Sequence, residues 1–251
     1  ILASAIVMFV ANLSDPETRM LITDVAYVPT TAILMILSIM MAIRFRTKGQ
    51  HAKAWILFVC FTSSWFIAEQ LWLVYELVYK IDPWPSMADF FYLAGYPLLV
   101  TFSIFYLKPV KKAISRKLVI SAVTISGVLL IPTLYIASGP NSEISNFEVA
   151  LASSYPILDA LILCPAIIGV TLFFKGEVNF LWSLICAATI LNVIADTGFL
   201  VLSIDDSYYT GHPIDLLYLW AYILFAFGVY SHMKIFKSRI NDPYEDADAL
   251  R

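Results

Sequence analysis

Charge and cysteine are both scarce in this sequence. Charged residues make up 14% of the 251 positions and hydrophobic residues 60%, with a mean hydropathy of +0.79. That balance excludes an ordinary soluble domain. Cys60, Cys164 and Cys186 lie inside apolar runs, without a CxxC pair or the spacing of metal ligands, so we interpret all three as buried packing residues.

The alternation of apolar and polar residues that marks an outer-membrane barrel is also missing. Apolar residues come in runs of about 20, and a helix of that length crosses a hydrocarbon layer about 30 Å thick. Because lipid leaves the backbone no other partner, we predict an all-α fold, a polytopic membrane helical bundle. A shorter apolar stretch, 1–13, is either the end of an eighth helix or the remnant of a signal sequence. The seven predicted spans cover roughly residues 24–46, 54–79, 86–107, 117–138, 149–174, 178–203 and 213–236.

Lysine and arginine are distributed unequally between the two sides of these spans. Fourteen of the 16 basic residues follow the first, third, fifth and seventh spans, and only Arg19 and Lys80 lie opposite. The positive-inside rule therefore predicts a multi-pass protein of the plasma membrane, with a cytoplasmic C-terminus and with the segment before residue 24 outside. These charges are topological signals, so the lipid bilayer is a predicted partner and nucleic acid is not. An outer aromatic belt is expected at Trp72, Tyr75, Tyr79, Trp84, Tyr208 and Tyr209.

The sequence contains an internal repeat. A shift of 127 residues aligns rare residue types without a gap, and a shift of 126 matches the pattern D-x-x-Y-L-x-x-Y over 89–96 to the same pattern over 215–222. The larger shift matches Pro29 with Pro156, Trp55 with Trp182, and Glu69 with Asp196. We therefore predict a 3+1+3 arrangement of two parallel three-helix repeats, related by an axis along the membrane normal. The predicted segments are a partial N-terminal helix and outer loop (1–23), repeat A (24–107), a linker helix with loops (108–148), repeat B (149–236) and a cytoplasmic tail (237–251).

Carboxylates occur within the spans, where no lysine or arginine is available to pair with them. All fall in the predicted outer half, and charged residues at such depth usually face a bundle interior or a water-filled cavity. Acids interleaved with aromatic rings at helical spacing suit a cation or an amine. We therefore predict an outward-facing pocket for a small ligand. The candidate ligand-binding residues are Glu69, Asp159, Asp196, Asp89, Asp215, Tyr92, Tyr96, Tyr218, Tyr222, Asn192 and Trp65.

Some of these residues have a structural alternative. Asp89 and Asp215 follow prolines in the first turn of a helix, where a carboxylate stabilises the helix end. The tyrosines could be interfacial anchors, and Glu76, nearer the end of its span, could face the outer surface. Both interpretations stay open at this point.

No catalytic residue and no cofactor are predicted. A divalent cation is the one exception, since Glu69 and Asp196 could contribute oxygen ligands. A three-histidine zinc site is excluded, because His51 and His232 are predicted on the cytoplasmic side and His212 on the outer side. Retinal is not expected, because the seventh span has no lysine before Lys234 to form a Schiff base.

The stretch over residues 82–99 reads DPWPSMADFFYLAGYPLL. It resembles a segment of the N-terminal regions of bacterial membrane-bound diguanylate cyclases and related signalling proteins, which pair a DPxPSxADxxYLxxYPL-like stretch with seven or eight helices. The resemblance implies a sensory input module. The sequence up to Arg251 contains no output domain. We therefore expect one of two arrangements: an output domain outside this sequence, or a module that works alone, as a homodimer or through a cytoplasmic signalling partner.

Three functions therefore compete. The favoured one is an integral membrane sensor or binding module with an acidic, aromatic pocket for a cation, an amine or another small molecule. The first alternative is a small-molecule or ion transporter with parallel repeats, which is weakened because the inner half offers no matching polar path. The second alternative is an intramembrane metal-dependent hydrolase.

Overall fold

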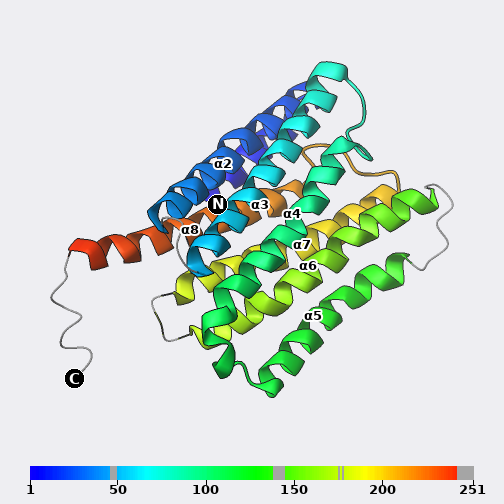
Figure 1. The fold of residues 1–251 in the computed structure, drawn as a ribbon. Coiled ribbons are helices and arrows are strands. Elements are labelled where there is room, and N and C mark those ends of the chain that lie inside the picture. Colours follow the sequence, from blue (N-terminus) through cyan, green and yellow to red (C-terminus); the bar gives the residue numbers. More distant parts are fainter. Residues whose placement is uncertain (46–49, 138–144, 175, 177, 242–251) are drawn as a thin grey trace, which may run out of the picture.

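The computed structural model describes residues 1–45, 50–137, 145–174, 176 and 178–241, and these contain helices and no strand (Figure 1). Within them, seven helices are long and apolar enough to cross a membrane, which confirms the predicted all-α class. Arg46, Lys48, Lys175 and Arg251, counted above for orientation, lie outside the described residues. The helices are α1 (Leu2–Asn12), α2 (Pro16–Phe45), α3 (Gln50–Leu73), α4 (Met87–Leu107), α5 (Arg116–Ala137), α6 (Asn146–Leu172), α7 (Asn179–Ile204) and α8 (Asp215–Asn241). A π-helical turn, η1 (Val74–Tyr79), continues α3, and a 3-10 helix, η2 (Lys108–Ala113), continues α4.

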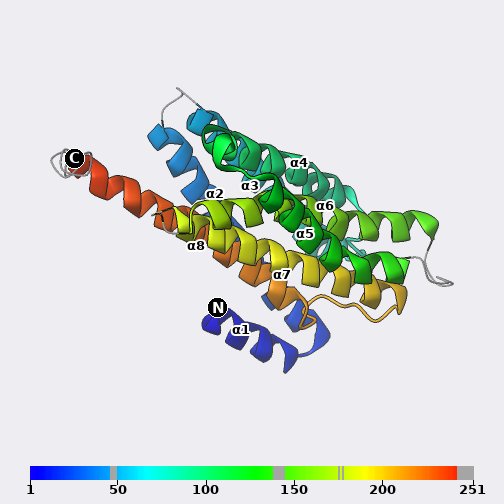
Figure 2. The same cartoon turned by 90° about the horizontal axis from the view of Figure 1, so that it is seen from below.

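Six of the helices form a closed ring. Helices α2, α3, α4, α6, α7 and α8 each pack against the next, and α8 returns to α2 (Figure 1). Helix α5 lies outside the ring against α6 and α7, and α1 lies outside it against α2 and α8 (Figure 2). The ring thus has two halves, α2–α4 and α6–α8, with α5 between them in the sequence. The duplication of these halves stays a prediction.

The first long helix begins earlier than predicted, at Pro16 instead of residue 24. The Asp15 carboxylate accepts a hydrogen bond from the backbone N–H of Thr18 at 3.0 Å, and proline suits the first position of a helix. The bonds with Thr18 hold the pKa of the Asp15 carboxyl below its ordinary value. The predicted outer loop within 1–23 is therefore a short turn around Ser14. As a consequence, Asp24 lies well inside a helix and not at its start.

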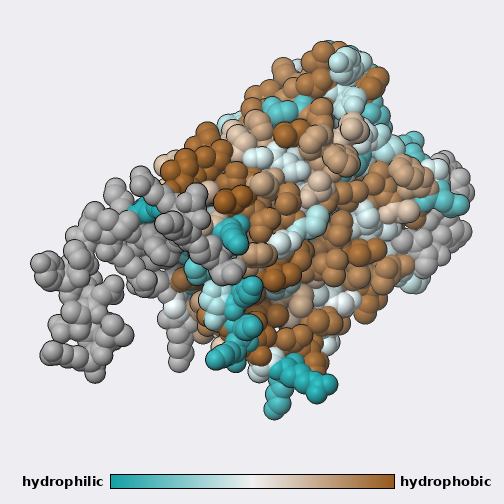
Figure 3. Space-filling model, viewed as in Figure 1, coloured by the Kyte–Doolittle hydropathy of each residue, from teal (hydrophilic) through white to brown (hydrophobic). Residues whose placement is uncertain are grey.

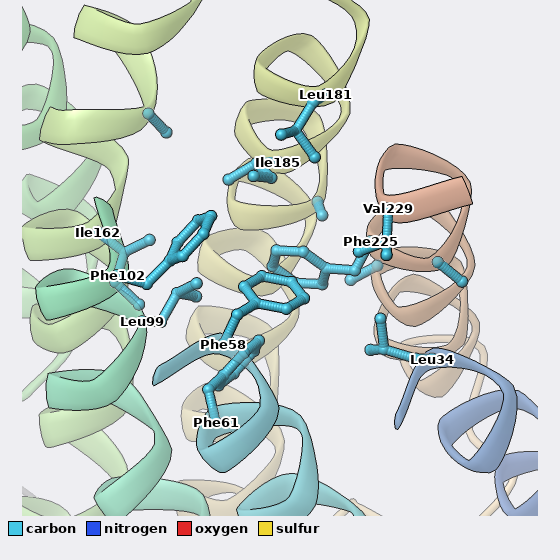
Figure 4. Close-up of a cluster of buried hydrophobic side chains, with 14 of the residues drawn as sticks. Leu34, Phe58, Phe61, Leu99, Phe102, Ile162, Leu181, Ile185, Phe225 and Val229 are labelled. Carbon is cyan, nitrogen blue, oxygen red and sulfur yellow. The ribbon is translucent and has the colours of Figure 1, made fainter. Parts of the chain in front are cut away.

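Aromatic side chains from both halves fill the interior of the ring over part of its length. Figure 4 shows Phe58 and Phe61 of α3 meeting Phe102 of α4 and Phe225 of α8. The rings of Phe58 and Phe102 are 4.8 Å apart between centroids, and those of Phe61 and Phe225 are 5.7 Å apart. The repeat-matched tryptophans Trp55 and Trp182 are completely buried beside them. We name these four phenylalanines and two tryptophans the aromatic core; their side chains fill the interior of the ring at this level.

The outer surface of the bundle is apolar over most of its length. Figure 3 shows hydrophobic residues across the middle of the visible face and hydrophilic ones toward the ends. Helix α5 exposes Ile120, Ile131 and Leu134, as expected for contact with lipid. The interpretation of Cys60 as buried is wrong: it is exposed, and Cys164 and Cys186 are only partly buried. An apolar run does not distinguish a core-facing position from a lipid-facing one, which explains the error.

Candidate ligand-binding pocket

A pocket with a volume of about 110 Å³ lies inside the ring, toward the end formed by the connections 80–86 and 205–214. It is lined by residues of α2, α3, α4, α6, α7 and α8 and of both connections. The space is enough for several water molecules or a small organic molecule. Ten of the eleven candidates named from the sequence line it, and Asp159 does not. The ten are Trp65, Glu69, Asp89, Tyr92, Tyr96, Asn192, Asp196, Asp215, Tyr218 and Tyr222.

The two repeat-matched carboxylates each accept a hydrogen bond from the opposite half of the ring. The Tyr222 hydroxyl of α8 donates to Glu69 of α3 at 2.6 Å. The Tyr96 hydroxyl of α4 donates to Asp196 of α7 at 3.2 Å. Tyr218 of α8 also donates to Asp196, at 2.6 Å. These tyrosines are therefore not interfacial anchors: all three position the carboxylates, and Tyr222 and Tyr96 also link the halves.

Asp89 has the capping role proposed as its structural alternative, whereas Asp215, in the first turn of α8, binds the connection before its helix. One oxygen of Asp89 accepts a hydrogen bond from the backbone N–H of Ser86 at 2.7 Å, which completes a capping box. One oxygen of Asp215 accepts from the backbone N–H of Gly211 at 2.8 Å. The second oxygen of each carboxylate accepts a hydrogen bond from a tyrosine hydroxyl, Tyr155 for Asp89 and Tyr208 for Asp215. Their part in ligand binding stays a prediction.

Sequence reasoning missed several lining residues. Asp24 of α2 is 5% exposed and lines the pocket, and no described residue donates a hydrogen bond of normal geometry to its Oδ2 atom. Tyr27, one turn further along α2, and Tyr155 of α6 also line it. The signal for Asp24 was its spacing of three residues from Tyr27, which places both on one helix face. That signal was lost because the span was predicted to begin at residue 24.

The predicted aromatic belt and the outward position of Glu76 both need correction. Three of the six predicted belt residues, Trp72, Trp84 and Tyr208, line the pocket, whereas Tyr79 and Tyr209 are exposed, so the belt stays a prediction for the exposed residues. Glu76 is 8% exposed and accepts a hydrogen bond from Trp72 Nε1 at 3.1 Å, so it is buried. The π-helical turn that begins at Val74 changes the direction of side chains at the end of α3, which simple helical spacing does not foresee.

The described residues that line the pocket include five carboxylates and eleven aromatic rings but no lysine, arginine or histidine. The basic residues predicted at this end interact elsewhere. Lys80 pairs with Glu17 at 3.1 Å on the surface. The Arg19 guanidinium lies 4.1 Å from the centre of the Tyr209 ring, and its Nε donates to the Thr210 carbonyl at 3.3 Å. The pocket therefore concentrates acidic groups without a basic partner in its wall.

The connection before α8 adds no positive charge. Burial lowers the pKa of His212, and its Nδ1 atom accepts a hydrogen bond from the backbone N–H of Ile214 at 3.2 Å, so the ring is neutral. Burial and the nearby Asp215 carboxyl raise the pKa of Tyr208 well above its ordinary value. Tyr208 therefore remains a hydrogen-bond donor at every physiological pH.

No group of three histidine, cysteine or acidic side chains that could hold a metal ion is found in the part of the chain that the structure describes. A divalent cation at Glu69 and Asp196 therefore stays a prediction without a third protein ligand to support it. The arrangement instead resembles the aromatic cages that bind organic cations, since rings surround carboxylates that already accept hydrogen bonds.

Comparisons with protein-family models, with curated proteins and with solved structures found no match to this chain. The resemblance over 82–99 therefore stays an expectation. In the structure this stretch covers the connection before α4 and the first half of α4, and it contributes Trp84, Asp89, Tyr92 and Tyr96 to the pocket wall.

Proposed function

We propose that this chain is a membrane sensor or ligand-binding module whose pocket takes a small organic cation, such as an amine. The observation that carries the proposal is a wall whose described residues include five carboxylates and eleven aromatic side chains but no basic one. A cation over an aromatic face gains about 0.5–2 kcal/mol, most where water is excluded. A carboxylate inside a membrane bundle adds attraction that solvent screens only weakly.

Hydrogen bonds between the halves of the ring give such a module a way to respond. Tyr222 and Tyr96 link the halves through Glu69 and Asp196, and Tyr155 links them through Asp89. A bound ammonium group donates to the same carboxylates and competes with the tyrosine hydroxyls. Binding would then change the packing of α2–α4 against α6–α8, which a homodimer or a cytoplasmic signalling partner could detect.

The proposal is tested by thermal unfolding of the protein in lipid nanodiscs with alkylammonium ions, from methylammonium to tetramethylammonium. A ligand at one hundred times its Kd stabilises the folded state by about 2.7 kcal/mol, so a clear rise in Tm is expected. The double variant Glu69→Gln, Asp196→Asn should lose this rise, because both substitutions keep the shape and remove the charge.

The matched control is Asp205→Asn with Asp206→Asn. These two exposed acids lie in the connection after α7, and asparagine tolerates the positive φ of 49° at position 206. The control should keep the full rise in Tm. An equal rise in the Glu69 and Asp196 double variant would refute the pocket as the binding site.

Gly95→Ala tests the shape of the same pocket. A Cβ atom at position 95 would lie 2.3 Å from Nε1 of Trp65, which lines the pocket and donates to the Tyr92 carbonyl at 3.0 Å. Trp65 must therefore move, and we expect affinity for tetramethylammonium to fall about tenfold, or about 1.4 kcal/mol, measured by titration calorimetry. Unchanged affinity in a folded variant would show that Trp65 does not contact the ligand.

The transporter alternative is less well supported. The aromatic core blocks the ring beyond the pocket, with Phe102 between Trp55 and Trp182 at centroid distances of 5.6 and 6.3 Å. Counter-flow of labelled methylammonium into proteoliposomes separates the two functions. Uptake above that of empty liposomes would favour transport over a sensor.

A further inference from the structure

Asp159 is a buried acid that the pocket itself does not use. It lies on α6 with 1% of its side chain exposed, and no described residue donates a hydrogen bond of normal geometry to either carboxylate oxygen, although the Tyr96 hydroxyl and the Asp196 carboxyl lie beside it. The Asp196 carboxyl of α7 is a direct neighbour of Asp159 and does line the pocket. Burying an isolated ionised carboxylate in such a place costs free energy, unless a positive charge pairs with it or a proton neutralises it.

Among the described residues, no element packed against this pair supplies a positive charge. Helix α4 presents the Tyr96 hydroxyl, α8 presents Tyr218 and Tyr222, and α6 itself presents Tyr155. The contact of α5 with α7 is uncharged, a hydrogen bond of 2.8 Å between Thr133 and Thr197. Two carboxyl groups that face each other can hydrogen-bond only when one of them carries a proton.

From this geometry we infer that Asp159 and Asp196 share one proton and that a cation entering the pocket displaces it. The inference rests on the proposed function, and it adds that ligand binding is an exchange of one cation for one proton. Before binding, the pair consists of one carboxyl and one carboxylate, with a charge of −1. After binding, the O–H bond has broken and both groups are carboxylates. The cation restores the total charge to −1, and the proton passes through the pocket to water.

A second acidic pair must be distinguished from this one. Asp24 of α2 lies beside the Glu76 carboxyl, and no described residue donates a hydrogen bond of normal geometry to its Oδ2 atom. Variants at Asp159 and at Asp24 therefore assign any released proton to one pair or the other.

Titration calorimetry with tetramethylammonium in buffers of different ionisation enthalpy measures the exchange. This probe carries no dissociable proton, so any proton released comes from the protein. The wild-type protein should release about one proton per bound cation, and its affinity should rise about tenfold per pH unit while the pair is protonated. No binding at all would overturn the proposed function and this inference together. Binding without proton release would overturn only the inference.

Asp159→Asn should still bind tetramethylammonium but release no proton, with an affinity that no longer rises with pH. A merely structural role for Asp159 would leave proton release intact, and that result overturns the inference. Asp24→Asn should bind more weakly but keep the release. Loss of release in Asp24→Asn alone would assign the proton to the other pair and refute the proposal.

Infrared difference spectroscopy of the wild-type protein gives a readout that needs neither Asp159→Asn nor Asp24→Asn. Adding tetramethylammonium to the wild-type protein should remove a protonated-carboxyl band and add carboxylate absorption. If Asp159→Asn does not fold, Asp159→Leu replaces it as the control, because leucine has similar branching and suits a membrane bundle. Its infrared spectrum should not change when tetramethylammonium is added. An unchanged wild-type spectrum on saturation would contradict the exchange.

Discussion

Replacing Gly169 by alanine is expected to destabilise the bundle by about 1–3 kcal/mol, the usual range for overpacking a well-packed interior. Gly169 lies on α6, and a Cβ atom there would sit 2.2 Å from two atoms of the Trp182 ring. Trp182 cannot withdraw easily, because it is completely buried and stacks on Phe173 and Phe102 at centroid distances of 6.3 Å. The methyl group must therefore separate α6 from α7 or displace the aromatic core.

Gly127→Ala is the matched control for this substitution. Gly127 also lies within a transmembrane helix, α5, but a Cβ atom there would meet nothing within 4 Å. Alanine favours the helix by about 0.5–1 kcal/mol over glycine, so this variant should equal or exceed the wild type in stability. Thermal unfolding of both variants in the same detergent measures the difference. Equal destabilisation of the two variants would mean that contact with Trp182 does not decide the outcome at Gly169.

The spans and most of the pocket were predictable from the sequence because two strong patterns agree. Hydropathy runs identified all seven long helices, and for six of them the predicted bounds lie within a few residues of the observed ones. The shift of 127 residues singled out Glu69 and Asp196 before any contact was known. Helical spacing then grouped acids with tyrosines, and the structure places ten of the eleven candidates around one pocket.

Contacts between distant segments were not predictable in the same way. Nothing local in the sequence connects Tyr222 to Glu69, or Tyr155 to Asp89, because these bonds depend on which helices become neighbours in the ring. Asp24 was missed for a local reason: the cap at Asp15 allows a helix to begin in a polar stretch that hydropathy excludes. Asp159 was identified as a pocket residue although it lies behind Asp196, because both occupy mid-helix positions and differ only in the face they present.

A lysine at position 192 should act as a tethered ligand. Asn192 of α7 is buried, lines the pocket and lies one turn before Asp196, so an ammonium group at 192 would reach the carboxylates from within the wall. We expect Asn192→Lys to be more stable than Asn192→Met, a substitution of similar length without charge. The expected difference is about 1.5–3 kcal/mol, the range for hydrogen bonds to charged groups.

The same variant should no longer respond to tetramethylammonium, because its own ammonium group occupies the position of the cation. Asn192→Met partly fills the pocket but leaves its negative charge, so it should retain a weakened response. Thermal unfolding of both variants, with and without tetramethylammonium, gives the four Tm values that test this.

Loss of folding in Asn192→Lys beside a folded Asn192→Met would show that the pocket does not stabilise a cation. Equal stability of the two variants together with an intact response in Asn192→Lys would place the cation site away from Asp196. Asn192→Lys should be more stable than Asn192→Met and lose its response to tetramethylammonium only if one positive charge in the pocket interacts favourably with the carboxylates of the wall.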